Sequence, residues 1–303
     1  MRVRGMRLLE CVPNISEGRD QEKIASLAEE LEKHKRIKLL DCSSDKDHHR
    51  SVFTFIGEPK AVMDAAFSFT LRALDLIDMR EHKGGHPRLG AVDVIPFVPV
   101  RGVGMEEAVQ LAHEFGRGLG SRGISIFFYE EAAIRPERKD LPSIRKGEYE
   151  GLMEKLKDPE WKSDEGPDHF NPKSGATVVG ARFPLVAYNV NLNTKDLSLA
   201  KEIAKKVRFR DGGFSHVRAM GVDLKEKGMV QVSMNLTRYQ VTNIPSVYEF
   251  IKQEGLKNGI GIEDSEIVGL IPLGVLEGVV QTYLKCPQFS VRQVIEERIL
   301  EFE

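Results

Sequence analysis

The sequence predicts an α/β (α+β) protein of two ferredoxin-like β-α-β-β-α-β subdomains, with facing sheets and with the helices on the outside. The chain has 303 residues, which is long for one core and suits two, at roughly 150 residues per domain. Hydrophobic residues make up 41% and charged residues 30%, an ordinary globular composition. Both halves show the same order of predicted elements, although we find no sequence identity between them.

The first half alternates apolar runs with amphipathic segments. Residues 51–57 are rich in β-forming side chains and predict a strand, and Pro59 suits the first position of the helix that follows. Pro96 and Pro99 suggest that the strand at residues 92–100 lies at a sheet edge or contains a bulge. The expected strands lie at residues 8–12, 37–41, 51–57, 92–100 and 124–129, and the helices at 21–36, 59–76, 105–119 and 143–156.

The segment at residues 157–174 breaks this alternation. It holds three prolines, several acidic residues and the single tryptophan of the chain, without any periodicity. We interpret it as a connection between two domains. The predicted domains are residues 1–174, with the connection at about 157–174, and residues 175–303.

The second half repeats the element order of the first. Its expected elements are a strand region at residues 177–192, a helix at 197–207, a hairpin at 217–236, a helix at 246–257, a strand at 267–271, and helices at 273–284 and 291–302. Helices in this fold cover one face of each sheet, so the other face must be buried or used. Two such faces opposite each other would form a ligand cleft.

Charge and cysteine content limit the class of function. Lys+Arg 44 against Asp+Glu 46 gives a net charge of −2, which argues against a general nucleic-acid binder. The three cysteines Cys11, Cys42 and Cys286 have no CxxC spacing, which favours a reducing compartment. No apolar run approaches the roughly 18 residues that span a bilayer, and the N-terminus lacks an apolar signal region. We therefore expect a cytoplasmic protein without nucleic-acid or membrane partners.

The most informative stretch is residues 82–90, with the sequence HKGGHPRLG. It joins a predicted helix to a predicted strand, and its glycines allow the backbone to approach a ligand closely. Histidine titrates near neutral pH and is the usual general acid/base, so His86 is the catalytic candidate. The alternative for this stretch is a surface turn with solvated histidines.

A second polar loop contains Asp47, His48 and His49. Carboxylate and imidazole groups are ligands of transition metals, and an Asp-His-His run occurs in a family of manganese-dependent phosphoesterases. The other aspartate motifs of those enzymes are missing, and adjacent side chains on a loop diverge. We expect no metal site, and keep a metal-dependent phosphoesterase as a less favoured alternative.

Other segments leave their roles open. The turn at residues 14–18 could contact a ligand at a strand end, and Cys11 is expected to be a small buried hydrophobe rather than a nucleophile. Gln231, Ser233 and Asn235 share one strand face, either aimed at a cleft or solvated. The chain has no Walker A motif and no dinucleotide fingerprint that leads into a helix, so nucleotide-dependent chemistry lacks support.

Taken together, these segments resemble the glutamate formimidoyltransferase (formiminotransferase) family, in its single-function form without the cyclodeaminase domain. The resembling segments are collinear and lie at residues 10–18, 50–57, 82–90, 92–102, 145–150, 175–182, 189–192 and 231–233. The resemblance implies facing sheets with a folate-binding tunnel between them, and a homodimer. It also implies transfer of the formimino group from N-formimino-L-glutamate to tetrahydrofolate, the co-substrate, giving 5-formimino-tetrahydrofolate and glutamate, with no tightly bound cofactor.

The resemblance also assigns residues to roles. The general acid/base of the family's His-Pro-Arg-x-Gly motif falls on His86. His82, Lys83 and Arg88 are further substrate-binding candidates, because Lys and Arg could hold substrate carboxylates and Arg is the better bidentate partner. The family's folate-contacting stretch corresponds to Gly166, Pro167, Asp168, His169, Phe170, Asn171, Pro172, Lys173, Ser174 and Gly175.

The chain departs from the family pattern at two positions. Gly85 stands where the family usually has a glutamate, and Ser43 where some members have an aspartate. If that aspartate orients the histidine, another group must do so here, with Asp41 and Asp45 as candidates. Two further alternatives keep the fold, namely formyl transfer between 5-formyl-tetrahydrofolate and glutamate on the same site, and folate binding without catalysis.

Overall fold

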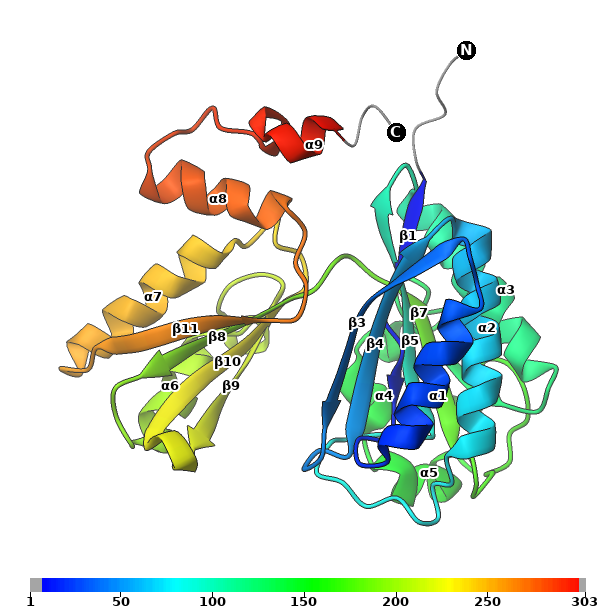
Figure 1. The fold of residues 1–303 in the computed structure, drawn as a ribbon. Coiled ribbons are helices and arrows are strands. Elements are labelled where there is room, and N and C mark those ends of the chain that lie inside the picture. Colours follow the sequence, from blue (N-terminus) through cyan, green and yellow to red (C-terminus); the bar gives the residue numbers. More distant parts are fainter. Residues whose placement is uncertain (1–6, 300–303) are drawn as a thin grey trace. The chain divides into compact units, whose positions relative to one another are not determined.

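The computed structural model describes residues 7–299, and the chain divides into two compact units (Figure 1). The first unit ends at Arg182 and the second begins at Phe183. Each unit combines one sheet with helices, which confirms the predicted α+β class with two subdomains. The predicted facing of the two sheets remains a prediction.

The first unit is built on a seven-stranded sheet. Its strands are β1 (Leu8–Cys11), β2 (Asn14–Ile15), β3 (Ile37–Asp45), β4 (Arg50–Gly57), β5 (Val92–Arg101), β6 (Ser125–Glu130) and β7 (Ala176–Ala181). β1 and β2 both lie between β4 and β5, so the antiparallel order β3-β4-β1-β5 is that of a ferredoxin-like sheet. β7 and β6 extend this sheet with parallel pairs beyond β5.

Helices lie on both faces of this sheet. They are α1 (Gln21–Glu32), α2 (Pro59–Leu76), α3 (Met105–Gly120), α4 (Leu141–Arg145) and α5 (Glu148–Lys155). Figure 1 shows α1, α2 and α3 along one side of the sheet. On β6, Ile126 and Phe128 enter the core that includes α1, α2 and α3. Phe127 and Tyr129 point to the opposite face and enter a second core with Ile144 of α4.

The expected domain connection is part of the first unit. Asp164 accepts hydrogen bonds from the Phe128 amide and from the fully buried Arg138 guanidinium, so residues near 164 pack beside β6. β7 then completes the first sheet, and every residue of it is buried. The unit boundary therefore falls after Arg182 rather than at residue 174.

The second unit is a four-stranded antiparallel sheet in the order β11-β8-β10-β9. Its elements are β8 (Val186–Leu192), α6 (Leu197–Val207), β9 (Val217–Leu224), β10 (Met229–Leu236), α7 (Ile244–Lys257), β11 (Ile262–Val268), α8 (Gly274–Tyr283) and α9 (Ile295–Ile299). The β8-α6-β9-β10-α7-β11 succession confirms the predicted β-α-β-β-α-β order. The strand expected at residues 177–192 is in fact two strands, β7 and β8, in two different sheets.

Two C-terminal expectations shift in position. β11 begins five residues before the predicted start at residue 267. The helix expected at residues 291–302 is a 3₁₀ turn, Val291–Gln293, followed by the short α9, and its last residues lie outside the described part of the chain. Within residues 7–299, no helix is both long enough and apolar enough to cross a lipid bilayer.

Candidate active site

The two polar loops that the sequence singled out lie against each other. The loop between α2 and β5 contains His86, and the β3–β4 turn contains His48. The Gly85 amide donates to the Asp47 carbonyl at 3.3 Å, and the His48 and His86 rings meet edge to face, with centroids 6.3 Å apart. A Cβ on Gly84 would lie 2.4 Å from the His48 carbonyl oxygen, so only glycine permits this approach.

His86 lies at a small polar pocket and accepts a hydrogen bond from an arginine. The Nη1 of Arg50 is 2.7 Å from His86 Nε2, and Arg50 Nη2 donates to the Asn14 side-chain oxygen. Arg50 and Asn14 also line the pocket. Because a guanidinium only donates, Nε2 must offer its lone pair and the His86 imidazole is neutral.

Burial and neighbouring cations favour this neutral form. Burial of the ring is the largest cause, and together with Arg50, Arg145 and His48 it lowers the pKa of His86 to about 3. Burial, and then Arg145, lower the pKa of the Arg50 guanidinium to about 10. The site is therefore an electropositive pocket around a neutral imidazole.

Arg145 reaches this site from α4 and is bound by a buried carboxylate. Its Nη2 pairs with Asp93 Oδ2, while Asp93 Oδ1 accepts from the Leu89 amide at 2.9 Å. Asp93 sits near the start of β5, within an otherwise apolar strand. This pair connects α4 and β5 to the loop that holds His86.

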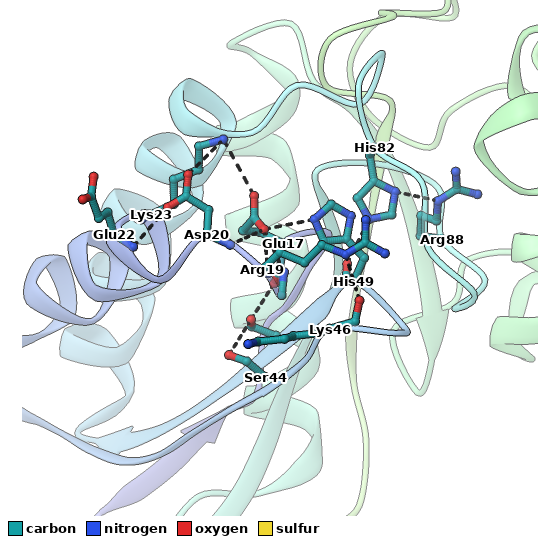
Figure 2. A network of polar contacts seen from close by, with 12 residues as sticks. Glu17, Arg19, Asp20, Glu22, Lys23, Ser44, Lys46, His49, His82 and Arg88 are labelled. Carbon is teal, nitrogen blue, oxygen red and sulfur yellow. Dashed lines mark hydrogen bonds and ion pairs between the residues drawn. The ribbon is translucent and has the colours of Figure 1, made fainter. Parts of the chain in front are cut away.

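A second network fixes His82 beside the pocket. Figure 2 shows Glu17, His49, His82 and Arg88 in that order. The His49 and His82 rings stack at 4.3 Å with 6° between their planes. His82 Nε2 is 2.9 Å from the His49 carbonyl, and His82 Nδ1 accepts from Arg88 Nε at 3.2 Å. Burial, the largest cause, lowers the pKa of His82, in keeping with this neutral tautomer.

Arg88 is buried and fully engaged within the protein. Its Nη1 lies 3.0 Å from Glu148, and its Nη2 lies 2.6 Å from Glu150. With Nε on His82, all three nitrogens of the guanidinium have partners. The loop residue Lys83, by contrast, is exposed and borders a cavity of about 410 Å³ that Arg88, Glu148 and Glu150 also line.

The turn at residues 14–18 contributes to the site through a buried carboxylate and through residues that line the pocket. One carboxylate oxygen of the buried Glu17 accepts from the Gly18, Arg19 and Asp20 amides and from His49 Nε2, at 2.9 to 3.0 Å. Burial opposes ionisation, but the backbone N–H groups and His49 outweigh it and lower the pKa of Glu17. Besides this support, Asn14 and Ser16 of the turn line the His86 pocket.

The Asp-His-His run turns its side chains to different partners. His48 Nδ1 pairs with Asp45 at 2.8 Å, whereas His49 pairs with Glu17. Within residues 7–299, no three His, Cys, Asp or Glu side chains gather as a metal would require. Asp45 therefore holds His48, and the group in contact with His86 is Arg50.

The expected folate stretch runs beside the loop that contains His86 and on to β6. The Ala91 amide donates to the Ser174 carbonyl at 2.9 Å, and the Ala176 amide to the Leu89 carbonyl at 3.2 Å. The Pro167 carbonyl accepts from Ser125 Oγ at the start of β6. Ser174 and Gly175 are buried, whereas Asp168, His169, Pro172 and Lys173 are exposed. Phe170 packs against Tyr149, with ring centroids 5.3 Å apart.

Sequence reasoning missed three charged residues of the site. Arg50, Asp93 and Arg145 all fall in family-like segments, but no motif gave them a role. A signal existed for Asp93, because a lone carboxylate within a strongly apolar strand must have a buried partner. No such signal pairs Arg145 with it, since 52 residues separate the two.

Comparisons with known proteins identify the family of this chain. The family model described as "Formiminotransferase domain, N-terminal subdomain" matches residues 8–182, and "Formiminotransferase domain" matches residues 187–301. The chain is 43% identical to a glutamate formimidoyltransferase of Thermoplasma acidophilum, over 97% of this chain and 98% of the relative. It is 40% identical to one of Streptococcus pyogenes serotype M1, over 97% and 99%. The formimidoyltransferase-cyclodeaminase of Rattus norvegicus is 44% identical, and the match covers 89% of this chain and 51% of the rat protein. The chain belongs to the formiminotransferase family.

Proposed function

We propose that this chain is a glutamate formimidoyltransferase that moves the formimino group of N-formimino-L-glutamate to tetrahydrofolate, giving 5-formimino-tetrahydrofolate and glutamate. The observation that supports this proposal most is the state of His86. Its imidazole is neutral, and its Nε2 lone pair faces an electropositive pocket. Two relatives of nearly equal length bear the name of this activity. Tetrahydrofolate is the co-substrate of the proposed reaction, which needs no tightly bound cofactor.

The proposed chemistry requires one group that moves one proton. N5 of tetrahydrofolate attacks the amidine carbon of the donor and forms a tetrahedral intermediate. His86 Nε2 takes the proton from N5 and delivers it to the glutamate nitrogen, which then leaves with the electron pair of the broken C–N bond. The folate gains the formimino group, and His86 returns to its neutral form. Much of the rate comes from holding the two reactants in line.

The folate contacts are proposed for residues 166–175. The hydrogen bonds of Ser174 and Ala176 to the loop that contains His86 support this assignment, because they place the end of the stretch beside that loop. Lys83 is exposed at the cavity edge and is proposed to meet a substrate carboxylate. Arg88 and His82 are proposed to hold the loop rather than the ligand, since their polar atoms already have partners.

His86→Ala tests catalysis against folate binding alone. Loss of a general acid/base costs about 10²–10⁴-fold in turnover. We expect kcat to fall by this factor while the folate dissociation constant, measured by fluorescence quenching, stays within about twofold of the unmodified protein. If turnover does not change, His86 is not the proton carrier. If neither protein turns over but both bind folate, the chain is a binding protein.

The proposal extends to location and assembly. We place the enzyme in the cytoplasm as a homodimer without nucleic-acid or membrane partners. The free thiols of Cys11, Cys42 and Cys286 support a reducing compartment. Sedimentation of the purified chain tests the dimer.

A further inference from the structure

Arg50 differs from the other arginines around His86 in the groups that it touches. Arg88 pairs with Glu148 and Glu150, and Arg145 pairs with Asp93. Arg50 contacts the amide oxygen of Asn14 and the ring nitrogen of His86, both of which are neutral. Asp93 and Asp45 act on Arg50 electrostatically without forming an ion pair with it. A half-buried guanidinium without a directly paired anion is costly, because the loss of water is not compensated by a contact with an opposite charge.

Unsatisfied polar atoms gather at the same place. In the described part of the chain, the buried side-chain atoms without a hydrogen-bond partner are His49 Nδ1, Arg50 Nε, Arg145 Nε, Arg138 Nε and Thr177 Oγ1. The first two belong to residues that line the His86 pocket, and Arg145 is near enough to lower the pKa of His86. Buried polar groups normally have partners, so orphans that gather at one pocket indicate a ligand.

We propose that Arg50 is the binding site for a glutamate carboxylate of the substrate, and that this carboxylate draws Arg50 away from His86 Nε2 and frees the lone pair for proton transfer. The inference rests on the proposed function and adds the residue that recognises the donor. The planar guanidinium offers parallel N–H groups that match a carboxylate in a bidentate pair. Its unpartnered Nε–H supplies one of them.

The charged groups around His86 give a reason why binding of a carboxylate would activate the histidine. His86 faces Arg50 from β4, Arg145 from α4 and His48 from the β3–β4 turn. Asp93 of β5 already pairs with Arg145, and Asp45 already pairs with His48. One carboxylate on Arg50 therefore compensates the one cation that has no anion. Binding therefore raises the pKa of His86, while burial of the ring, the largest cause of its low value, remains.

The direct test is the titration of His86 in the full chain, followed by NMR of ¹³C-labelled histidine and assigned with His86→Gln. In the free protein we expect a pKa well below the ordinary range, as the contact with Arg50 requires. Saturating L-glutamate should raise it by at least about one unit, which corresponds to tenfold in proton affinity. The diamide of glutamate, which has the same length and no carboxylate, should leave it unchanged. An equal shift with the diamide, or no shift with glutamate, overturns the proposal.

Tetrahydrofolate also carries carboxylates, in its glutamyl tail, and these could bind Arg50 in the same way. If tetrahydrofolate alone raises the pKa of His86 and L-glutamate does not, the donor assignment is overturned and Arg50 serves the folate tail. If L-glutamate alone raises it, the donor assignment stands. Neither arm requires turnover, so a failed transferase assay would refute the proposed function without deciding this inference.

Arg50→Gln gives a second, independent readout. It should raise the KM for the formimino donor by at least about tenfold and abolish the glutamate-induced shift of the His86 pKa. Arg50→Lys keeps the positive charge but loses the planar guanidinium that pairs bidentately with a carboxylate, so the KM should stay nearly as high as in Arg50→Gln. Arg36→Gln, on an exposed arginine paired with Glu58, is the matched control and should leave both readouts unchanged. An unaltered donor KM in a folded Arg50→Gln protein contradicts the proposal, and the wild-type titration decides if that variant does not fold.

Discussion

His86 is held in its neutral form by a contact whose chemistry leaves no choice of proton position. Arg50 donates to Nε2, so a proton can join that nitrogen only if the guanidinium moves. A pKa of about 3 would make His86 a poor base near neutral pH, where a general base works best with a pKa close to the working pH. In the substrate-free site Arg50 thus occupies the lone pair of His86, and substrate binding must free it for proton transfer.

The pH dependence of stability reports on this state. The pKa of His86 is about 3 in the fold and about 6.5 in the unfolded chain, so between these values only the unfolded chain takes up the proton. The stability that neutral His86 contributes is present above pH 6.5 and is lost as the pH falls toward 3. His86→Gln cannot take up that proton, so its free energy of unfolding should fall less between pH 7 and pH 4.5. Urea unfolding at both pH values measures this, and an equal or steeper fall in the variant would disprove it.

Arg88 should matter for stability more than for substrate affinity. Arg88→Met removes the contacts with His82, Glu148 and Glu150 and should cost about 1–3 kcal/mol of unfolding free energy. The donor KM should change less than threefold, as the guanidinium is already engaged. Urea unfolding and initial-rate kinetics measure both quantities. A large increase in KM at unchanged stability would return Arg88 to the substrate site.

At this scale the sequence identified the loop and the histidine but not the histidine's partner. His86 lies in a glycine-rich motif that can be recognised from residues 82–90 alone. Arg50 and Arg145 reach His86 from β4 and α4. Contacts between residues so far apart in the sequence leave no local pattern in the chain. The sequence offered Asp41 or Asp45 as the orienting group, whereas the contact comes from Arg50.

The elements near the site show where periodicity is sufficient and where it fails. The helices α2, α3 and α6 follow their predicted spans closely, since each has a continuous apolar stripe, whereas α1 ends at Glu32, four residues before its predicted end. The two prolines of β5 suggested an edge or a bulge, and β5 is an interior strand with a shift of register beside Pro99. The sequence predicts one strand region where the structure has β7 and β8, because buried apolar runs do not reveal which sheet they join.

A glycine fixes the junction between β7 and the loop that contains His86. Gly175 has φ +64, and a Cβ there would lie 2.1 Å from the Leu89 carbonyl oxygen. Gly175→Ala should therefore cost about 1 kcal/mol for the backbone conformation and more for the clash. Gly259→Ala has nearly the same φ, +71, with nothing within 4 Å, and isolates the first cost. Thermal unfolding of both variants compares them, and equal losses would show that the clash is relieved at no cost.

The described residues form two units, as the length and the repeated element order predicted, and the first unit contains two of their three hydrophobic cores. The second unit has the β-α-β-β-α-β form followed by α8 and α9, while the first adds α3, β6, α4, α5 and β7 to that form. These additions supply the Arg145 side chain and the stretch proposed to bind folate. The sequence predicted residues 157–174 as a connection because the segment around Trp161 lacks periodicity, yet buried ion pairs such as Arg138 with Asp164 hold that region in the first unit.

The central claim, formimino transfer centred on His86, is tested most directly by a donor comparison in the presence of a chelator. The unmodified chain is given tetrahydrofolate with N-formimino-L-glutamate, and methenyl-folate absorbance is read after acid cyclisation. A parallel reaction follows the loss of 5-formyl-tetrahydrofolate with glutamate. We predict product from the formimino donor that survives chelation. Turnover with the formyl donor alone, or turnover that the chelator removes, would contradict the account.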